Sequence, residues 1–186
     1  LDVIRNSDWN VESKNTFLIA AYSLLNLFTT AIFPIETLEK AIENGKLAAG
    51  ISSPYARICK LWDLADNAEA VAEQCYNVTG ILERLYRAGF SECRKYDALK
   101  QRMITAASRN IAVVVPKAYY IDILLADESF NLKNTTFVTA NRFDNSEQYD
   151  EVVVSGNYYS KRFNALKCRA APDITVLLYE CEIHEF

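Results

Sequence analysis

The sequence predicts an α/β fold in which an N-terminal helical region precedes a small parallel sheet. Residues 1–108 carry apolar side chains at helical spacing, whereas residues 109–186 contain short, continuous apolar runs rich in β-branched residues, with helical patterns between them. Continuous apolar strands alternating with helices are typical of a parallel sheet that is covered on both faces. We therefore expect a helical domain over 1–108 and a three-layer αβα domain over 109–186.

The helical region shows start and stop signals around each expected helix. Ser53 followed by Pro54 is one such start, a hydroxyl cap before proline at the first helical position. The apolar run "TFLIAAYSLLNLFTTAIF" is interrupted by polar residues and lacks a basic flank, so we interpret it as a core helix and expect no membrane span. The expected helices cover residues 16–33, 35–44, 54–65, 67–88 and 91–106.

The second half is expected to contain four strands. They are "IAVVVP" (111–116), "TTFVTA" (135–140), "YDEVVVSG" (149–156) and "DITVLLYECE" (173–182). The segments "KAYYIDILLAD" and "NYYSKRFNALKCRA" have helical spacing and are expected to connect strands. A helix between parallel strands gives the usual right-handed crossover connection.

Composition narrows the classes of protein that fit. The chain has 186 residues, a net charge of −4 and 51% hydrophobic residues, as expected for a globular protein that lacks a general basic surface for nucleic acid. The five cysteines form no CxxC pair, which favours free thiols in a reducing compartment, so we expect a cytoplasmic protein. The chain begins at Leu1 and its one methionine is Met103, so we expect an excised piece of a longer protein.

Several catalytic classes lack their motifs. No G-x-x-x-x-G-K-[ST] and no G-x-G-x-x-G occurs, which excludes a P-loop NTPase within this chain. The single histidine, His184, lies near Glu182 and Glu185, but one histidine at a strand end provides neither a convincing metal site nor the base of a serine triad. We expect no metal ion and no cofactor in this fragment.

One anion-binding arrangement remains possible in the second half. Ser155 and Gly156 turn the chain at a strand end, and a helix is expected to begin near Asn157 with Lys161 and Arg162 in its first turns. Free amides at a helix N-terminus favour an anion, and ligands of open parallel sheets bind beyond the carboxyl ends of the strands. The alternative is that Gly156 only makes the turn and that both basic side chains are solvated.

The order of these segments resembles the second RecA-like domain of superfamily 1 helicases of the UvrD/Rep type, over residues 109–183. "IAVVVPKAYYIDILLAD" is similar to the family's motif IV, and "FVTANRFDNSEQYDEVVVSG" to its motif V. "FNALKCRAAPDITVLLYECE" resembles motif VI, a helix ending in Thr-Arg-Ala before an apolar strand, with Cys168 in place of the threonine. A helical region before a helicase-like domain also resembles bacterial accessory or phage-defence proteins.

The resemblance implies a role for particular residues. Arg169 matches the family's arginine finger, which stabilises charge on the γ-phosphate held by the other motor domain. Thr139, Asn141 and Arg142 would lie near the cleft between domains or near a nucleic acid strand. ATP and Mg²⁺ would bind only together with a missing upstream domain, which is the implied partner, and nucleic acid is a further possible partner.

Two other hypotheses stay open. The chain fits a non-catalytic interaction module whose helical half binds a protein partner. It also fits a flavodoxin-like domain that binds a nucleotide or small molecule at the strand ends near Thr139, Ser155, Gly156 and Asn157.

Overall fold

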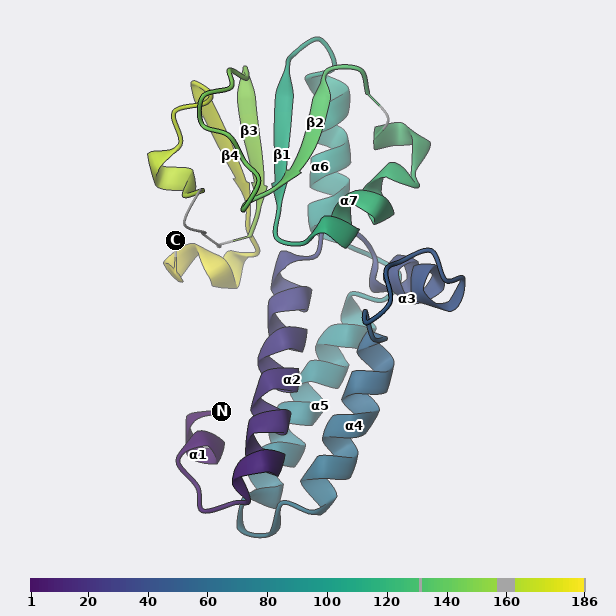
Figure 1. The fold of residues 1–186 in the computed structure, drawn as a ribbon, viewed down its shortest axis with the longest axis vertical. Coiled ribbons are helices and arrows are strands. Elements are labelled where there is room, and N and C mark those ends of the chain that lie inside the picture. The colour runs from purple at the N-terminus through teal and green to yellow at the C-terminus, as the bar shows by residue number, and fades with distance from the viewer. Residues whose placement is uncertain (131, 157–162, 186) are drawn as a thin grey trace.

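The computed structural model describes residues 1–130, 132–156 and 163–185, and it has the α/β fold that the sequence predicts (Figure 1). A body of helices is followed along the chain by a parallel sheet. Within the described ranges the helices are α1 (Asp2–Arg5), α2 (Val11–Thr30), α3 (Ile35–Glu43), α4 (Pro54–Asp66), α5 (Ala72–Ala88), α6 (Arg94–Thr105) and α7 (Ala118–Leu125). The strands are β1 (Ile111–Val115), β2 (Thr135–Thr139), β3 (Glu151–Ser155) and β4 (Asp173–Leu177). Short 3₁₀ turns are η1 (Glu69–Val71), η2 (Glu128–Phe130), η3 (Ala165–Lys167) and η4 (Glu180–Glu185).

The helices α2, α4 and α5 form an elongated bundle below the sheet (Figure 1). Asn10 caps α2 by accepting hydrogen bonds from two first-turn amides. Ser53 caps α4 by accepting one from the amide of Ala56, as its position before Pro54 predicts. Within the described residues no single helix is long and apolar enough to cross a membrane, although α2 and α3 together, bent by 118°, have the length and composition.

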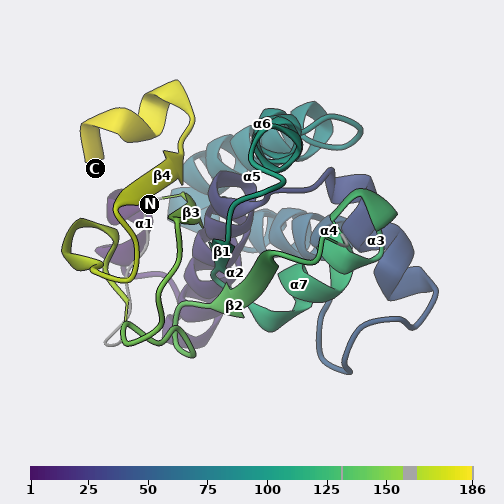
Figure 2. The same ribbon diagram turned by 90° about the horizontal axis from the view of Figure 1, so that it is seen from above.

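The four strands are all parallel and lie in the order β2-β1-β3-β4. Helices α6 and α7 cover one face of the sheet (Figure 2). The loop 140–150 and the segment 163–172, which contains η3, cover the other. Phe143, Phe163 and Ala170 are buried there against Val152 and Val154. The two central strands, β1 and β3, are buried at every position, which explains the apolar sequence of β1 and the three consecutive valines of β3.

Two predicted elements differ most from the structure. The helix expected over 157–170 lies outside the described residues as far as residue 162, and residues 163–170 contain only the turn η3. Phe163 and Ala165 are both buried and stand two positions apart, a spacing that suits extended chain better than helix. The last strand ends at Leu177, and the turn η4 replaces the predicted extension to residue 182.

The carboxyl ends of the strands face the helical bundle, and α2 ends directly beneath them (Figure 1). Gly156 has a φ of +82° at this contact, and a Cβ on it would stand 3.2 Å from Cγ2 of Thr30. Both the conformation and the close approach explain why glycine follows β3. One apolar core also runs through both halves, since Leu24 of α2 and Val153 of β3 belong to the same buried set.

Candidate functional site

The structure brings several of the predicted residues to the carboxyl edge of the sheet. Thr139 pairs with Val115, and Val154 pairs with Val114, so Thr139 and Ser155 lie level with each other on either side of β1. Ser155 is buried, and its Oγ has no hydrogen-bond partner among the residues that the structure describes. Asn141 and Arg142 follow β2 and are exposed. Asn157, Lys161 and Arg162 lie outside the described residues.

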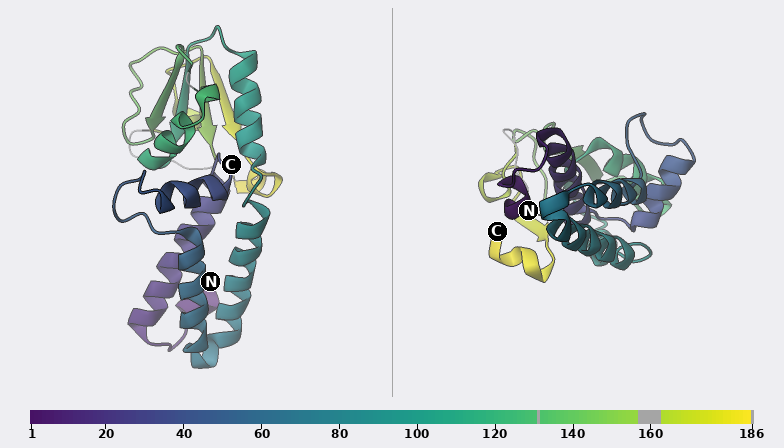
Figure 3. Two further views of the ribbon diagram at one scale, coloured as in Figure 1. Left: turned by 90° about the vertical axis from the view of Figure 1, so that its right-hand side faces the viewer. Right: turned by 90° about the horizontal axis from the view of Figure 1, so that it is seen from below.

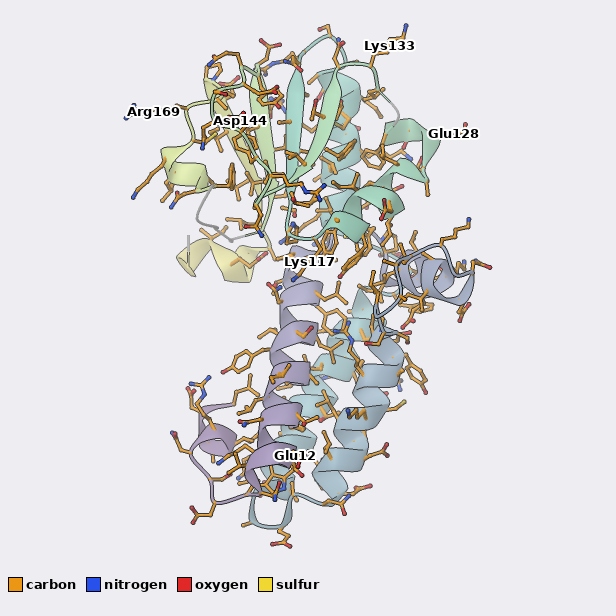
Figure 4. The ribbon with its side chains drawn as sticks, viewed as in Figure 1. Glu12, Lys117, Glu128, Lys133, Asp144 and Arg169 are labelled. Carbon is orange, nitrogen blue, oxygen red and sulfur yellow. The ribbon has the colours of Figure 1, made fainter. Side chains whose placement is uncertain are left out.

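Arg169 lies at the opposite edge of the sheet (Figure 4). It is exposed and stands in irregular chain just before β4, whose first residue, Asp173, is level with Glu151 at the start of β3. The helix end on which the resemblance places this arginine is absent at residues 168–170. Arg169 is therefore separated from Ser155 and Gly156 by the length of the strands.

A buried ion pair ties the C-terminal turn to the helices beside the carboxyl edge. Nζ of Lys95 donates to the backbone oxygen of Thr29 and to Oε2 of Glu182, each at 2.5 Å, and lies 4.4 Å from the ring centroid of Tyr179. The amide of Tyr179 donates to the same carboxylate at 2.7 Å. The lysine and the glutamate are 2% and 7% exposed, so the pair is largely removed from water.

Next to this pair is a cavity of about 840 Å³, which we call the junction cavity. It opens where the ends of α2 and α5, the start of α6 and the C-terminal turn meet, and Figure 3 shows η4 at the level between α6 and α5. Its surface is predominantly apolar. Its lining consists of Phe28, Thr29, Ala31, Phe33, Ile35, Leu85, Ala88, Gly89, Glu92, Cys93, Arg94, Tyr179 and Glu180.

The polar groups of the junction cavity are few. Cys93 is buried, and burial raises the pKa of its thiol, whose Sγ donates to the backbone oxygen of Ala31 at 3.5 Å. A thiol held in its neutral form is a poor nucleophile. Glu92 and Arg94 are exposed, and together with Glu180 they give the lining charges of both signs. This arrangement can bind an apolar group while leaving a polar group in water.

A second polar group of residues lies at the amino edge of the sheet. The carboxylate of Glu151, fully buried, accepts hydrogen bonds from Nε and Nη2 of Arg102 at 2.8–3.1 Å and from Oγ1 of Thr175 at 2.6 Å. Nη1 of Arg109 lies 3.4 Å from Oε2 of the same carboxylate, and Nη2 of Arg109 lies 2.5 Å from Oδ2 of Asp173. These partners all come from the chain itself, which indicates a structural network that joins α6 to the sheet.

Neither the junction cavity nor the buried pair follows from the sequence patterns. Leu85 and Ile81 are 39% and 48% exposed, although they continue the apolar face of α5. The apolar face of α5 is wider than packing against one core requires. This excess width was the signal in the sequence that could have indicated the cavity. The part of the chain that the structure describes contains no group of histidine, cysteine or acidic residues able to hold a metal ion, and the side chain of His184 lies outside that part.

Comparisons of this chain with protein-family models, with curated proteins and with solved structures gave no match.

Proposed function

We propose that the protein is a binding module whose junction cavity takes the apolar part of a small amphiphilic molecule. The observation that carries this proposal is the cavity itself, about 840 Å³ in volume and lined mainly by apolar side chains from α2, α3 and α5. Binding sites for small molecules are concave, mostly apolar and about 300–1,000 Å³ in volume, with a few polar groups that orient the ligand. The charged groups Glu92, Arg94 and Glu180 would contact the polar end.

The shape of the junction cavity suits a small-molecule ligand better than a protein partner that would bind through a flat surface. It is bounded by helices on several sides and by Tyr179 on the side of the sheet. The edge at which flavodoxin-like proteins bind ligands is covered here, because Thr30 of α2 packs against Gly156. The helical half therefore contributes more of the proposed site than the strand ends do.

Filling the cavity tests the proposal. Ala88 lines it from the last turn of α5, so Ala88→Trp is expected to occupy the apolar space and to weaken binding of an anilinonaphthalene sulfonate dye by at least about tenfold, the factor that corresponds to 1.4 kcal/mol. Dye fluorescence is titrated on the folded protein, with circular dichroism to confirm an unchanged helix content.

The matched control is Ala126→Trp. Ala126 is exposed at the end of α7 and is not part of the cavity lining, so this variant should bind the dye as the original chain does. Equal dye affinity in the Ala88→Trp and Ala126→Trp proteins would contradict the proposed site.

The hypothesis of a helicase motor domain remains a prediction. Its one favourable feature is that Arg169 is exposed and forms no ion pair within the described residues, so it is free to contact a phosphate held by another domain. Arg169→Ala in a longer protein that hydrolyses ATP would lower the rate by about 10³-fold or more if the arginine is a finger.

A further inference from the structure

The chain that follows β4 closes one side of the junction cavity. Tyr179 and Glu180 belong to the lining, and the turn η4 continues to Glu185 at the level between α5 and α6 (Figure 3). We call residues 179–185 the C-terminal cover. The hydroxyl oxygen of Tyr179 lies 4.0 Å from Sγ of Cys93, another lining residue. The pairing of β4 with β3 ends at Leu177, so strand pairing does not hold the cover in place.

One buried carboxylate attaches the C-terminal cover to the helices. Glu180 and Ile183 are exposed, whereas Glu182 is buried. Oε2 of Glu182 accepts from Nζ of Lys95 at 2.5 Å and from the amide of Tyr179 at 2.7 Å. The same ammonium group lies 4.4 Å from the ring centroid of Tyr179. Within the described residues this is the one ion pair that joins the cover to a helix.

This kind of attachment favours local opening. A buried ion pair gains little net free energy, because the attraction between its charges is offset by the loss of their hydration. Separating Lys95 and Glu182 returns both charges to water, so it costs less than removing either partner while the other stays buried. Segments with few buried apolar contacts open without unfolding of the whole molecule, and Ile183 of the cover is in solvent.

We propose that the C-terminal cover opens and closes as a unit over the junction cavity, and that the Lys95–Glu182 ion pair holds it closed. Tyr179 moves with Glu182, because its amide is bound to that carboxylate. Opening removes the wall that Tyr179 forms, widens the mouth of the cavity and uncovers Cys93. The inference rests on the proposed function for the nature of the molecule that enters, and such local openings commonly admit ligands.

Cys93 reports the opening without any ligand. It is buried, and burial raises the pKa of its thiol, so a bulky reagent such as fluorescein maleimide should reach it only after Tyr179 has moved. Cys75 of α5 is the internal control, since it is fully buried, has a pKa raised to about 11 and is not part of the cavity lining. Peptide mass spectrometry follows the two thiols separately in the whole chain.

The modification rates are measured in the original chain, without urea and in urea below the unfolding transition. Opening of the cover exposes little surface, so the rate at Cys93 should depend weakly on urea and exceed that at Cys75 at least about tenfold. Cys75 needs a larger opening, and its rate should rise steeply with urea. Equal rates with equal urea dependence at both thiols would show that only unfolding of the whole molecule exposes Cys93, and would overturn the proposal.

Glu182→Gln tests the ion pair. It keeps the size of the side chain and removes its charge, so the rate at Cys93 without urea should rise at least about tenfold, the factor that corresponds to 1.4 kcal/mol. Asp97→Asn is the matched control, because Asp97 is exposed in the first turn of α6 and the change in net charge is the same. An acidic residue there stabilises the helix start, so a matching rise in Asp97→Asn would assign the opening to α6. That result, or an unchanged rate in Glu182→Gln, would overturn the proposal.

Dye titration distinguishes failure of this inference from failure of the proposed function. Weaker dye binding in Ala88→Trp, together with an unchanged Cys93 rate in Glu182→Gln, would support the binding site and overturn the moving cover. The expected thiol rates, together with equal dye affinity in Ala88→Trp and Ala126→Trp, would support the moving cover and contradict the binding site.

Discussion

Glu151 shows how single residues hold the two halves of the molecule together. Its carboxylate is fully buried at the start of β3 and is bound by Arg102 from α6. Burial alone would raise the pKa of Glu151, but the hydrogen bonds from Arg102 and Thr175 and the charges of Arg102 and Arg109 lower it below the ordinary value of 4.5. The native state therefore prefers the ionised carboxylate.

This preference predicts how stability depends on pH. A lowered pKa in the folded state contributes stability above about pH 4.5, and that stability is lost as the pH falls through the folded value. Arg102→Met should lower the free energy of unfolding by about 3 kcal/mol at pH 7, since it leaves a buried carboxylate with fewer partners. The deficit should shrink as the pH falls below 4.5 toward the lowered pKa that Glu151 has in the folded state.

Urea unfolding of the two proteins at pH 7 and pH 3 measures this difference. Arg84→Met is the control, because Arg84 is exposed on α5 and its replacement should change stability by less than about 0.5 kcal/mol at either pH. A deficit for Arg102→Met that stays constant over this range would show that Glu151 does not carry the effect.

At the scale of residues, the local sequence predicted where a residue lies in the fold better than it predicted which residues it contacts. The turn at Ser155 and Gly156 lies at the carboxyl edge as expected. A glycine directly after an apolar strand indicates a turn, because glycine adopts positive φ values without steric cost. Lys95 could not be identified, since it occupies an ordinary polar position of a helical pattern. Its importance comes from α2 and the C-terminal turn, which only the folded chain brings near it.

At the scale of elements, α5 offers a simple stabilising change. Gly80 lies inside this helix, and a Cβ there would make an ordinary contact, 3.9 Å from the ring of Trp62. Glycine in a helix interior costs about 1 kcal/mol relative to alanine. Gly80→Ala should therefore raise the free energy of unfolding by about 0.5–1 kcal/mol.

Chemical denaturation monitored by circular dichroism checks this change. Gly45→Ala is an informative comparison, because Gly45 has a φ of +63° with open space around it, so alanine there should destabilise through backbone strain alone. Stabilisation by Gly45→Ala and destabilisation by Gly80→Ala would contradict the assigned conformations.

The elements predicted best were those with both a clear period and a clear boundary. Helices α3 and α4 begin within a residue of their predicted starts. Pro34 ends the preceding apolar run and the pair Ser53-Pro54 marks a helix start, and both signals act without tertiary help. The segment 163–170 has a helical pattern by count, yet its buried residues follow the surface of the sheet. There, contact with Val152 and Val154 overrides local propensity.

At the scale of the molecule, the shared core and the buried pair predict cooperative unfolding. Lys95 of α6 links the C-terminal turn to α2, and Lys95→Met would leave Glu182 buried without its cation. We expect this variant to lose about 3 kcal/mol of stability. Lys100→Met, on the same helix but 40% exposed, should lose less than about 1 kcal/mol.

Two probes report the two halves separately. Both tryptophans of the chain, Trp9 and Trp62, lie in the helical half, so their fluorescence follows that half, whereas hydrogen exchange of the amides of β1 and β3 follows the sheet. One core predicts coincident midpoints for both probes, in the original chain and in Lys95→Met. Separate midpoints would instead favour two independent domains divided near residue 108.

The end of α2 beneath the strand ends also has a mechanical consequence. A helix of 20 residues is a rod about 30 Å long, and this one is held at its upper end by Thr29 and Thr30 while its lower end lies far from the sheet. A tilt of about 10° at the held end would displace the other end by about 5 Å. A small change in the angle of α2 at the strand ends would therefore displace the far end of the helical bundle by several times as much as it moves the held end.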